Sequence, residues 1–162
     1  MNLLFTGASG FLGVNTLPFL RENYVVRTLG LSATVDYNLS LAEGVPAFNE
    51  KFDIVLHAAG KAHSVPRNDS EKQVFFSVNF EGTKNLCSAL ENSGIHQSCI
   101  FISTVAVYGL EEGENITEEY PLKGDSAYAL SKIMAEKYLI EWCEKHKVTL
   151  SIIRPSLIAG PK

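Results

Sequence analysis

The sequence lacks long apolar runs, clusters of basic residues and paired cysteines, and each absence disfavours a class of protein. None of its apolar runs approaches the ~20 residues of a membrane-spanning helix. Lys and Arg are scattered and the formal net charge is −4, so a nucleic-acid-binding surface is not expected. The three cysteines are odd in number and lack Cys-x-x-Cys spacing, which disfavours a disulfide framework and a zinc site. We expect a cytoplasmic protein with no metal, nucleic-acid or membrane partner.

Short apolar segments alternate with helical ones along the chain. Its 162 residues, 46% hydrophobic and 20% charged, are enough for one α/β core, and we expect a single domain over residues 1–162. The alternation predicts a doubly wound parallel sheet of about six strands with helices on both faces. The expected strands are Leu3–Thr6, Tyr24–Leu29, Thr34–Asp36, Ile54–Leu56, Cys99–Ser103 and Leu150–Arg154. The expected helices are Phe11–Glu22, Glu71–Ser93 and Ser126–His146.

A glycine-rich turn follows the first expected strand. The motif is Gly7-x-x-Gly10-x-x-Gly13, placed between a strand and a helix. The first glycine permits a tight turn, the second lets backbone N–H groups approach a pyrophosphate, and the third lets the helix pack closely on the strand. The turn therefore predicts a dinucleotide site at the N-terminal end of the domain.

Two further segments carry hydroxyl and amino groups suited to proton transfer. The expected strand Cys99–Ser103 ends in a hydroxyl residue and is followed by Thr104, and Tyr128 precedes Lys132 by four residues in an expected helix. Residues at i and i+4 share a helix face, so the Lys132 ammonium is expected to favour the Tyr128 phenolate by lowering the phenol pKa. Proton transfer at a sugar or alcohol hydroxyl is the chemistry that this pattern favours.

The order of the motifs resembles that of the extended short-chain dehydrogenases/reductases, in particular the NAD-dependent epimerase/dehydratase branch that works on nucleotide sugars. The resemblance implies an NAD(P)-binding Rossmann domain over 1–162 and a substrate-binding C-terminal domain that is missing. Truncation and a naturally short product are both left open. The segments that carry the resemblance are the glycine turn, Leu56–Gly60, Val78–Leu86, Phe101–Gly109, Tyr128–Lys132 and Ile153–Pro155.

The resemblance also implies roles for individual residues. Tyr128 would act as the proton donor and acceptor, Lys132 would bind the nicotinamide ribose and lower the phenol pKa, and Thr104 would orient the reacting sugar oxygen. Ser103 would help to hold Thr104 in position without contacting the substrate itself. The implied cofactor-binding residues are Gly7, Ser9, Gly10, Phe11, Leu12, Gly13, Asp36, Ala58, Ala59, Gly60, Asn79, Tyr128 and Lys132.

The choice between NAD and NADP departs from the family pattern. A carboxylate usually ends the second strand and binds the adenosine ribose, but Gly30 occupies that position here. Arg27 lies inside the strand and does not clearly replace it as a clamp for a 2′-phosphate, whereas Ser32 could bond either ribose form. Asp36 resembles the acid that contacts adenine. The resemblance favours NAD, with NADP as a close alternative.

Two apolar residues after Thr104 reduce the number of reactions that the family resemblance allows. The 4,6-dehydratases of the family carry an Asp-Glu pair directly after the catalytic hydroxyl residue, and Val105 and Ala106 stand there in this sequence. Three functions remain: epimerisation of a nucleotide sugar through a keto intermediate, NADPH-dependent reduction of a keto sugar, and a non-catalytic dinucleotide-binding regulatory module. Without a substrate domain, the isolated domain is expected to be inactive.

Other residues have structural interpretations or concern association. His57 is expected to be structural. Lys61 and His63 either face a diphosphate or lie in an exposed loop. The helices Glu71–Ser93 and Ser126–His146 resemble the pair through which family members dimerise, and a homodimer is expected. The apolar residues expected to be exposed on them include Phe76, Phe80, Ile133 and Ile140.

Overall fold

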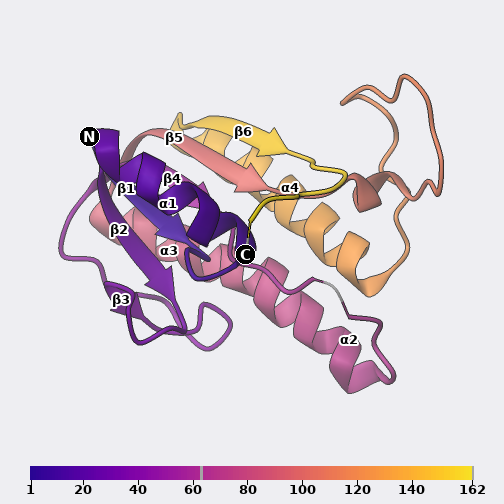
Figure 1. Ribbon diagram of the computed structural model, residues 1–162, viewed down its shortest axis with the longest axis horizontal. Coiled ribbons are helices and arrows are strands. Elements are labelled where there is room, and N and C mark those ends of the chain that lie inside the picture. Colours follow the sequence, from indigo (N-terminus) through magenta and orange to yellow (C-terminus); the bar gives the residue numbers. More distant parts are fainter. Residues whose placement is uncertain (63, 162) are drawn as a thin grey trace.

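A parallel sheet forms the centre of the computed structural model, which describes residues 1–62 and 64–161 and leaves His63 and Lys162 outside (Figure 1). The strand order is β3-β2-β1-β4-β5-β6, with all pairs parallel. This order reverses direction between β1 and β4, where open α/β sheets form a crevice at the carboxyl ends of their strands. The strands are β1 Asn2–Thr6, β2 Val25–Gly30, β3 Tyr37–Asn38, β4 Phe52–His57, β5 Ile95–Ile102 and β6 Thr149–Ile153.

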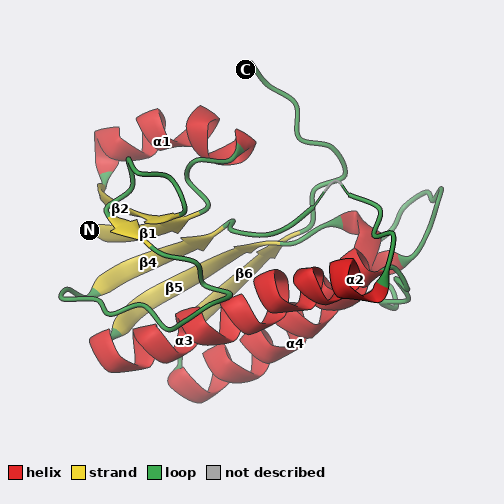
Figure 2. Ribbon diagram, turned by 90° about the horizontal axis from the view of Figure 1, so that it is seen from below, coloured by secondary structure: helices red, strands yellow, loops and turns green. Residues whose placement is uncertain are grey.

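Helices cover both faces of the sheet (Figure 2). Helix α1 (Phe11–Asn23) lies on one face, and α2 (Asp69–Phe75), α3 (Gly82–Ser93) and α4 (Ala127–His146) lie on the other. A π-helical turn, Phe76–Glu81, joins α2 to α3 in one continuous helical segment. The doubly wound Rossmann architecture predicted from the sequence is therefore confirmed.

Strand residues alternate between two cores. Leu3 and Phe5 of β1 pack in the cluster beneath α1, whereas Leu4 packs on the opposite side with Leu139 and Trp142 of α4. Successive side chains of a strand point to opposite faces, so a strand covered on both sides is apolar throughout. This explains why the strands are continuous apolar runs in the sequence.

Two expectations about these elements are wrong. The third strand is Tyr37–Asn38, not Thr34–Asp36, because residues 31–36 form the turn that returns the chain to the sheet. Ile133 is 7% exposed and packs against Val107 and Tyr108, so it does not contribute to an exposed apolar face. Ser126 is the N-cap of α4, since its Oγ accepts a hydrogen bond from the Ala129 N–H. Within the described ranges, every helix is too short or too polar to cross a bilayer.

Candidate functional site

The glycine turn after β1 makes two close approaches that need glycine. Gly7 has φ +79°, and a Cβ atom there would lie 2.6 Å from the Ala59 backbone nitrogen. A Cβ on Gly13 would lie 2.2 Å from the Ala8 carbonyl oxygen. The turn is thus pressed against the segment after β4, and α1 is pressed against the turn, as the glycine spacing predicts.

The start of α1 offers open backbone donors. Gly10 is the N-cap residue, has extended backbone and provides no side-chain hydrogen bond to the first helical turn. The first N–H groups of a helix have no intrahelical partner, so those of Phe11, Leu12 and Gly13 can bind an anion. A cavity of about 280 Å³ lies beside them. Its lining is Gly7, Ser9, Gly10, Leu29, Gly30, Leu31, Leu39, Ser40, Leu41, Ala42, Ala58, Ala59, Gly60 and Val78.

We call this space the nucleotide cavity. It lies where the sheet order reverses, its walls are mostly glycine and small apolar residues, and a helix N-terminus opens beside it. These properties fit the adenosine and pyrophosphate of a dinucleotide. Of the residues expected to bind the cofactor, the cavity brings together Gly7, Ser9, Gly10, Ala58, Ala59 and Gly60.

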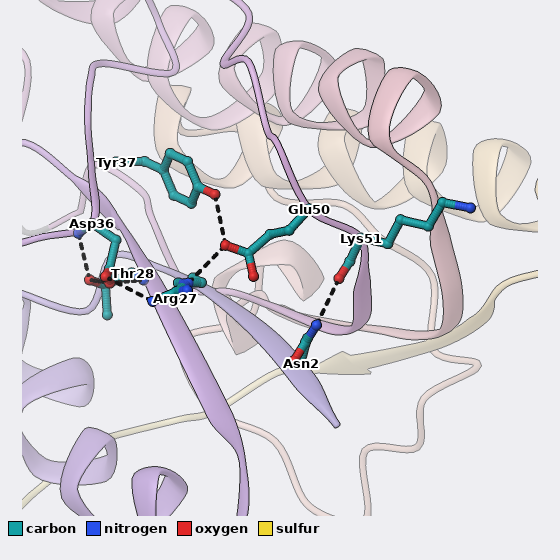
Figure 3. A network of polar contacts seen from close by, with 7 residues as sticks. All are labelled: Asn2, Arg27, Thr28, Asp36, Tyr37, Glu50 and Lys51. Carbon is teal, nitrogen blue, oxygen red and sulfur yellow. Dashed lines mark hydrogen bonds and ion pairs between the residues drawn. The ribbon is translucent and has the colours of Figure 1, made fainter.

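Asp36 lies outside the lining of the nucleotide cavity. Its Oδ2 accepts hydrogen bonds from the Thr28 N–H at 2.8 Å and the Thr28 hydroxyl at 2.7 Å (Figure 3). Burial raises the pKa of Asp36, but the bonds from Thr28 outweigh it and hold that pKa below its ordinary value. The structure therefore uses Asp36 to hold the β2–β3 turn, and the segment from Leu39 to Ala42, just after β3, lines the cavity instead.

A buried chain of hydrogen bonds links β1 and β4 to the helix below them. The Ala59 N–H donates to the Thr6 hydroxyl, which lies 2.7 Å from His57 Nδ1, and His57 Nε2 lies 2.9 Å from the Thr83 hydroxyl. Since Thr83 donates to the Asn79 carbonyl, it accepts from Nε2–H, and Nδ1 accepts from Thr6. Burial lowers the pKa of His57 to about 3, so the ring is neutral, and its role is the structural one of connecting Thr6 to Thr83 by hydrogen bonds.

Asn79 connects the loop after β4 to α4. Its Oδ1 accepts from the Lys61 N–H at 2.7 Å, and its Nδ2 donates to the Lys61 carbonyl and to the Ser131 hydroxyl. Ser131 in turn donates to the Tyr128 carbonyl. Asn79 lies in the π-helical turn, a local distortion often found at functional sites. It sets the path of Gly60 and Lys61 relative to Tyr128; His63, on the same loop, lies outside the described residues.

The three expected catalytic residues meet at the carboxyl end of β5. Thr104 is the second residue after the strand and its Oγ1 accepts from the Ala106 N–H, and the Thr104 hydroxyl is close enough to the Tyr128 phenol to lower the pKa of that phenol. Lys132 Nζ donates to the Ile102 carbonyl at 2.7 Å and lies 3.9 Å from the centroid of the Phe101 ring. Helix α4 thus brings the phenol and the amine to the end of the same strand, each with a different partner there.

Burial, not the neighbouring charge, governs the proton affinities of this group. It raises the pKa of Tyr128 above its ordinary value, an effect that the Thr104 hydrogen bond only partly offsets. It lowers the pKa of Lys132 to about 7, although Glu136 acts in the opposite direction. The expectation that Lys132 lowers the phenol pKa is wrong for this arrangement, because the amine is turned to Ile102. At neutral pH the phenol is a proton donor.

Sequence reasoning missed a buried ion pair behind the site. Glu136 is fully buried and accepts from the Ser103 hydroxyl and from two nitrogens of Arg154, at 3.1 and 2.7 Å. Arg154 also donates to the Tyr108 hydroxyl, and its pKa lies above its ordinary value because of the hydrogen bonds with Glu136. The only signals in the sequence are Glu136 four residues after Lys132 and an arginine directly after an apolar strand.

The low pKa of Lys132 predicts a pH dependence of stability. Between a pH of about 7 and about 10.5 the folded Lys132 is mostly neutral and the unfolded one protonated. The unfolded state then binds more protons, so the free energy of unfolding rises with pH in this window, by up to ~1.4 kcal/mol per unit. Lys132→Met removes this dependence. Urea unfolding of both proteins between pH ~7 and ~9 should show that the free energy of unfolding of the wild type increases relative to that of the variant as the pH rises. A difference in free energy that does not change with pH would mean that the folded amine stays charged.

Comparison with known proteins agrees with this geometry. The model of the NAD dependent epimerase/dehydratase family matches residues 3–162. The chain belongs to this family. It is 32% identical over 174 residues to N-acetyl-alpha-D-glucosaminyl-diphospho-ditrans,octacis-undecaprenol 4-epimerase from Escherichia coli O157:H7, covering 99% of this chain and 50% of that protein. The chain therefore spans about half the length of the curated relatives it matches.

Solved structures of the family share the fold. RMD from Pseudomonas aeruginosa complexed with NADPH superposes with a TM-score of 0.79 and 27% identity, over 96% of this chain and 53% of that one. UDP-glucose 4-epimerase from Thermus thermophilus, complexed with NAD, gives 0.77 and 28%, over 95% and 54%. The cofactor class expected from the sequence, NAD or NADP, is that of these two neighbours.

Proposed function

We propose that the chain is the NAD(P)-binding domain of an enzyme that oxidises and reduces a hydroxyl-bearing carbon of a nucleotide sugar. The observation that carries the proposal is the placement of Tyr128, Thr104 and Lys132 at the end of β5, beside the glycine-lined nucleotide cavity. Small walls at Gly7, Ala58 and Gly60 and the open N–H groups of α1 suit a dinucleotide, which when bound supplies or accepts hydride.

The residues of this chain supply the proton chemistry. Tyr128 donates its phenolic proton to the sugar oxygen as a carbonyl is reduced, and accepts it in the reverse direction. Thr104, whose hydroxyl lies beside the phenol, holds the same sugar oxygen in line. Lys132 is 4% exposed and lies 3.9 Å from the position of a Cβ on Gly60, so its amine faces the floor over which the cofactor ribose would lie.

Epimerisation through a keto intermediate is the net reaction that we propose first. Relatives include epimerases, dehydratases and reductases of sugars linked to a diphosphate. Dehydration needs an additional acid and base, and the residues that begin the turn after Thr104, Val105 and Ala106, provide neither. The sugar would be held mostly by residues beyond this domain, so the domain alone should bind cofactor but turn over little substrate.

Reduction of a keto sugar is the second candidate, and the state of Tyr128 favours it. A reductase needs a protonated phenol to donate to the forming alkoxide, and the raised pKa of Tyr128 keeps it protonated at neutral pH. An epimerase must also run the oxidising half-reaction, which needs the phenolate. The predicted homodimer stays a prediction; Val74, Leu130, Met134 and Ile140 are the exposed apolar residues on α2 and α4 that would support it.

The test is to mix the complete protein that carries this domain with UDP-, dTDP- and GDP-linked sugars and each cofactor. Product analysis by NMR should show an epimer with no net consumption of cofactor, while nicotinamide fluorescence reports a transient reduced form. Equimolar consumption of NADPH and one new hydroxyl would select the reductase. Tight cofactor binding without product from any sugar would contradict the enzymatic proposal and favour a regulatory module.

A further inference from the structure

A second cavity adjoins the nucleotide cavity. It has a volume of about 380 Å³ and lies between α1 and the turn from β2 to β3. Ser9 lines both cavities, so a ligand in the first can extend past Ser9 into the second. The lining of the second cavity is Ala8, Ser9, Val14, Leu17, Arg21, Thr28, Ser32, Thr34 and Val35.

Gly30 leaves the passage between the cavities open. It ends β2, and a Cβ atom there would lie 3.8 Å from Ser9 Oγ and 4.0 Å from Val35 Cγ1, so there is ordinary room for a side chain. A carboxylate near this position accepts a hydrogen bond from the ribose 2′-hydroxyl in NAD-binding domains and repels a 2′-phosphate. Glycine provides neither the bond nor the repulsion.

The polar groups of the second cavity suit an anion. Ser32 Oγ and Thr34 Oγ1 lie 2.9 Å apart at the surface, and either hydroxyl can turn its proton outward to a ligand. Arg21, in the last turn of α1, adds a guanidinium, and within residues 1–62 and 64–161 no carboxylate forms an ion pair with it. A guanidinium and two hydroxyls form a donor set typical of phosphate sites.

The nearby cation of β2 is engaged elsewhere. Arg27 Nε lies 2.8 Å from Glu50 Oε1, and its Nη1 lies 3.7 Å from Asp36 Oδ1 (Figure 3). The carboxylate of Asp36 is taken up by Thr28 and by Arg27, and it does not line the second cavity. Arg21 is therefore the cation available to a ligand there, and the neighbouring acids have partners of their own.

From these observations we infer that the second cavity binds the 2′-phosphate of NADP(H), held by Arg21, Ser32 and Thr34, and that the domain prefers NADP(H) to NAD(H). The inference rests on the proposed dinucleotide site. It names the cofactor of that site, and it favours the second candidate reaction over epimerisation, because a cofactor that exchanges with the NADPH pool suits net reduction of a keto sugar better than a permanently held NAD.

Calorimetric titration of the purified chain with NADP⁺ and NAD⁺ tests the inference. NADP⁺ should bind at least about tenfold more tightly, and its advantage should shrink as salt is added. Arg21→Gln should weaken NADP⁺ about tenfold and leave NAD⁺ unchanged, whereas Arg67→Gln, on an exposed loop, should change neither. Adenosine 2′,5′-bisphosphate should compete better than AMP, which places the effect at the 2′-phosphate.

Substitution of Gly30 gives a second, opposite readout. Gly30→Asp should reverse the preference by repelling the 2′-phosphate and bonding the ribose, and the neutral Gly30→Asn should lower NADP⁺ affinity far less. Equal or tighter binding of NAD⁺ to wild type, or equal loss of both cofactors in Arg21→Gln, would overturn the inference alone. Failure of both cofactors to bind would overturn the dinucleotide site and, with it, the proposed function.

Discussion

Arg154→Met is expected to destabilise the domain by about 3–5 kcal/mol, because it leaves a charged group buried without its partner. Glu136 is fully buried, and Arg154 supplies two of its hydrogen bonds, so among the residues that the structure describes the Ser103 hydroxyl is the donor left to it in the variant. Arg154 also donates to the Tyr108 hydroxyl and the Glu118 carbonyl, so the variant loses these two bonds to the segment after β5 as well. Urea unfolding followed by circular dichroism measures the loss.

The double variant Arg154→Met/Glu136→Gln separates the buried charge from lost packing. Removing the carboxylate charge removes the cause of most of the destabilisation, so the double variant should be more stable than Arg154→Met alone. If the two unfold at the same urea concentration, the effect of Arg154 comes from packing and not from the ion pair.

Local sequence patterns correctly predicted the elements whose conformation is determined by residues close by in the chain. Glycine spacing located the turn after β1 because the constraint, a backbone pressed on another backbone, acts within a few residues and admits only one residue type. The spacing of Tyr128 and Lys132 likewise predicted that both lie on one face of the helix that the structure shows as α4. The predicted position of the third strand was wrong because the strand consists of only two paired residues. These residues are held in place by the Tyr37 ring, which packs edge-on against Phe48 and Phe52, and no local sequence pattern encodes such contacts.

Burial explains the remaining errors. The i, i+4 spacing correctly makes Lys132 and Tyr128 neighbours, but the direction of their pKa shifts depends on how far each group is removed from water. The partnership of Glu136 with Arg154 joins a helix and a strand end 18 residues apart, and a sequence gives no sign that either charge is buried. The hydrogen bonds from Thr28 to Asp36 depend on the geometry of the turn, which the sequence pattern does not encode, and the contact of Asp36 with the cofactor stays a prediction.

Tyr128→Phe should lower kcat of the complete protein by a factor of about 10²–10⁴ and leave the Kd for cofactor unchanged. The phenol reaches Thr104 and the expected position of the sugar oxygen, so its removal deletes the proton donor while the nucleotide cavity keeps its lining. Tyr138→Phe is the matched control: the same change on the same helix, at a half-buried ring that packs on Phe80 away from the site. It should leave kcat unchanged.

Lys132→Met and Thr104→Val distinguish the partners of the phenol. Lys132→Met should raise the cofactor Kd as well as lower kcat, because the amine is assigned to the cofactor ribose and a misplaced ribose presents the nicotinamide poorly to the sugar. Thr104→Val should lower kcat alone, and Thr104→Ser, which restores the hydroxyl, should recover most of it. Steady-state kinetics beside cofactor titrations provide these constants. Wild-type kcat in Tyr128→Phe would remove the phenol from the mechanism, and the grouping of Tyr128, Thr104 and Lys132 would then have only a structural meaning.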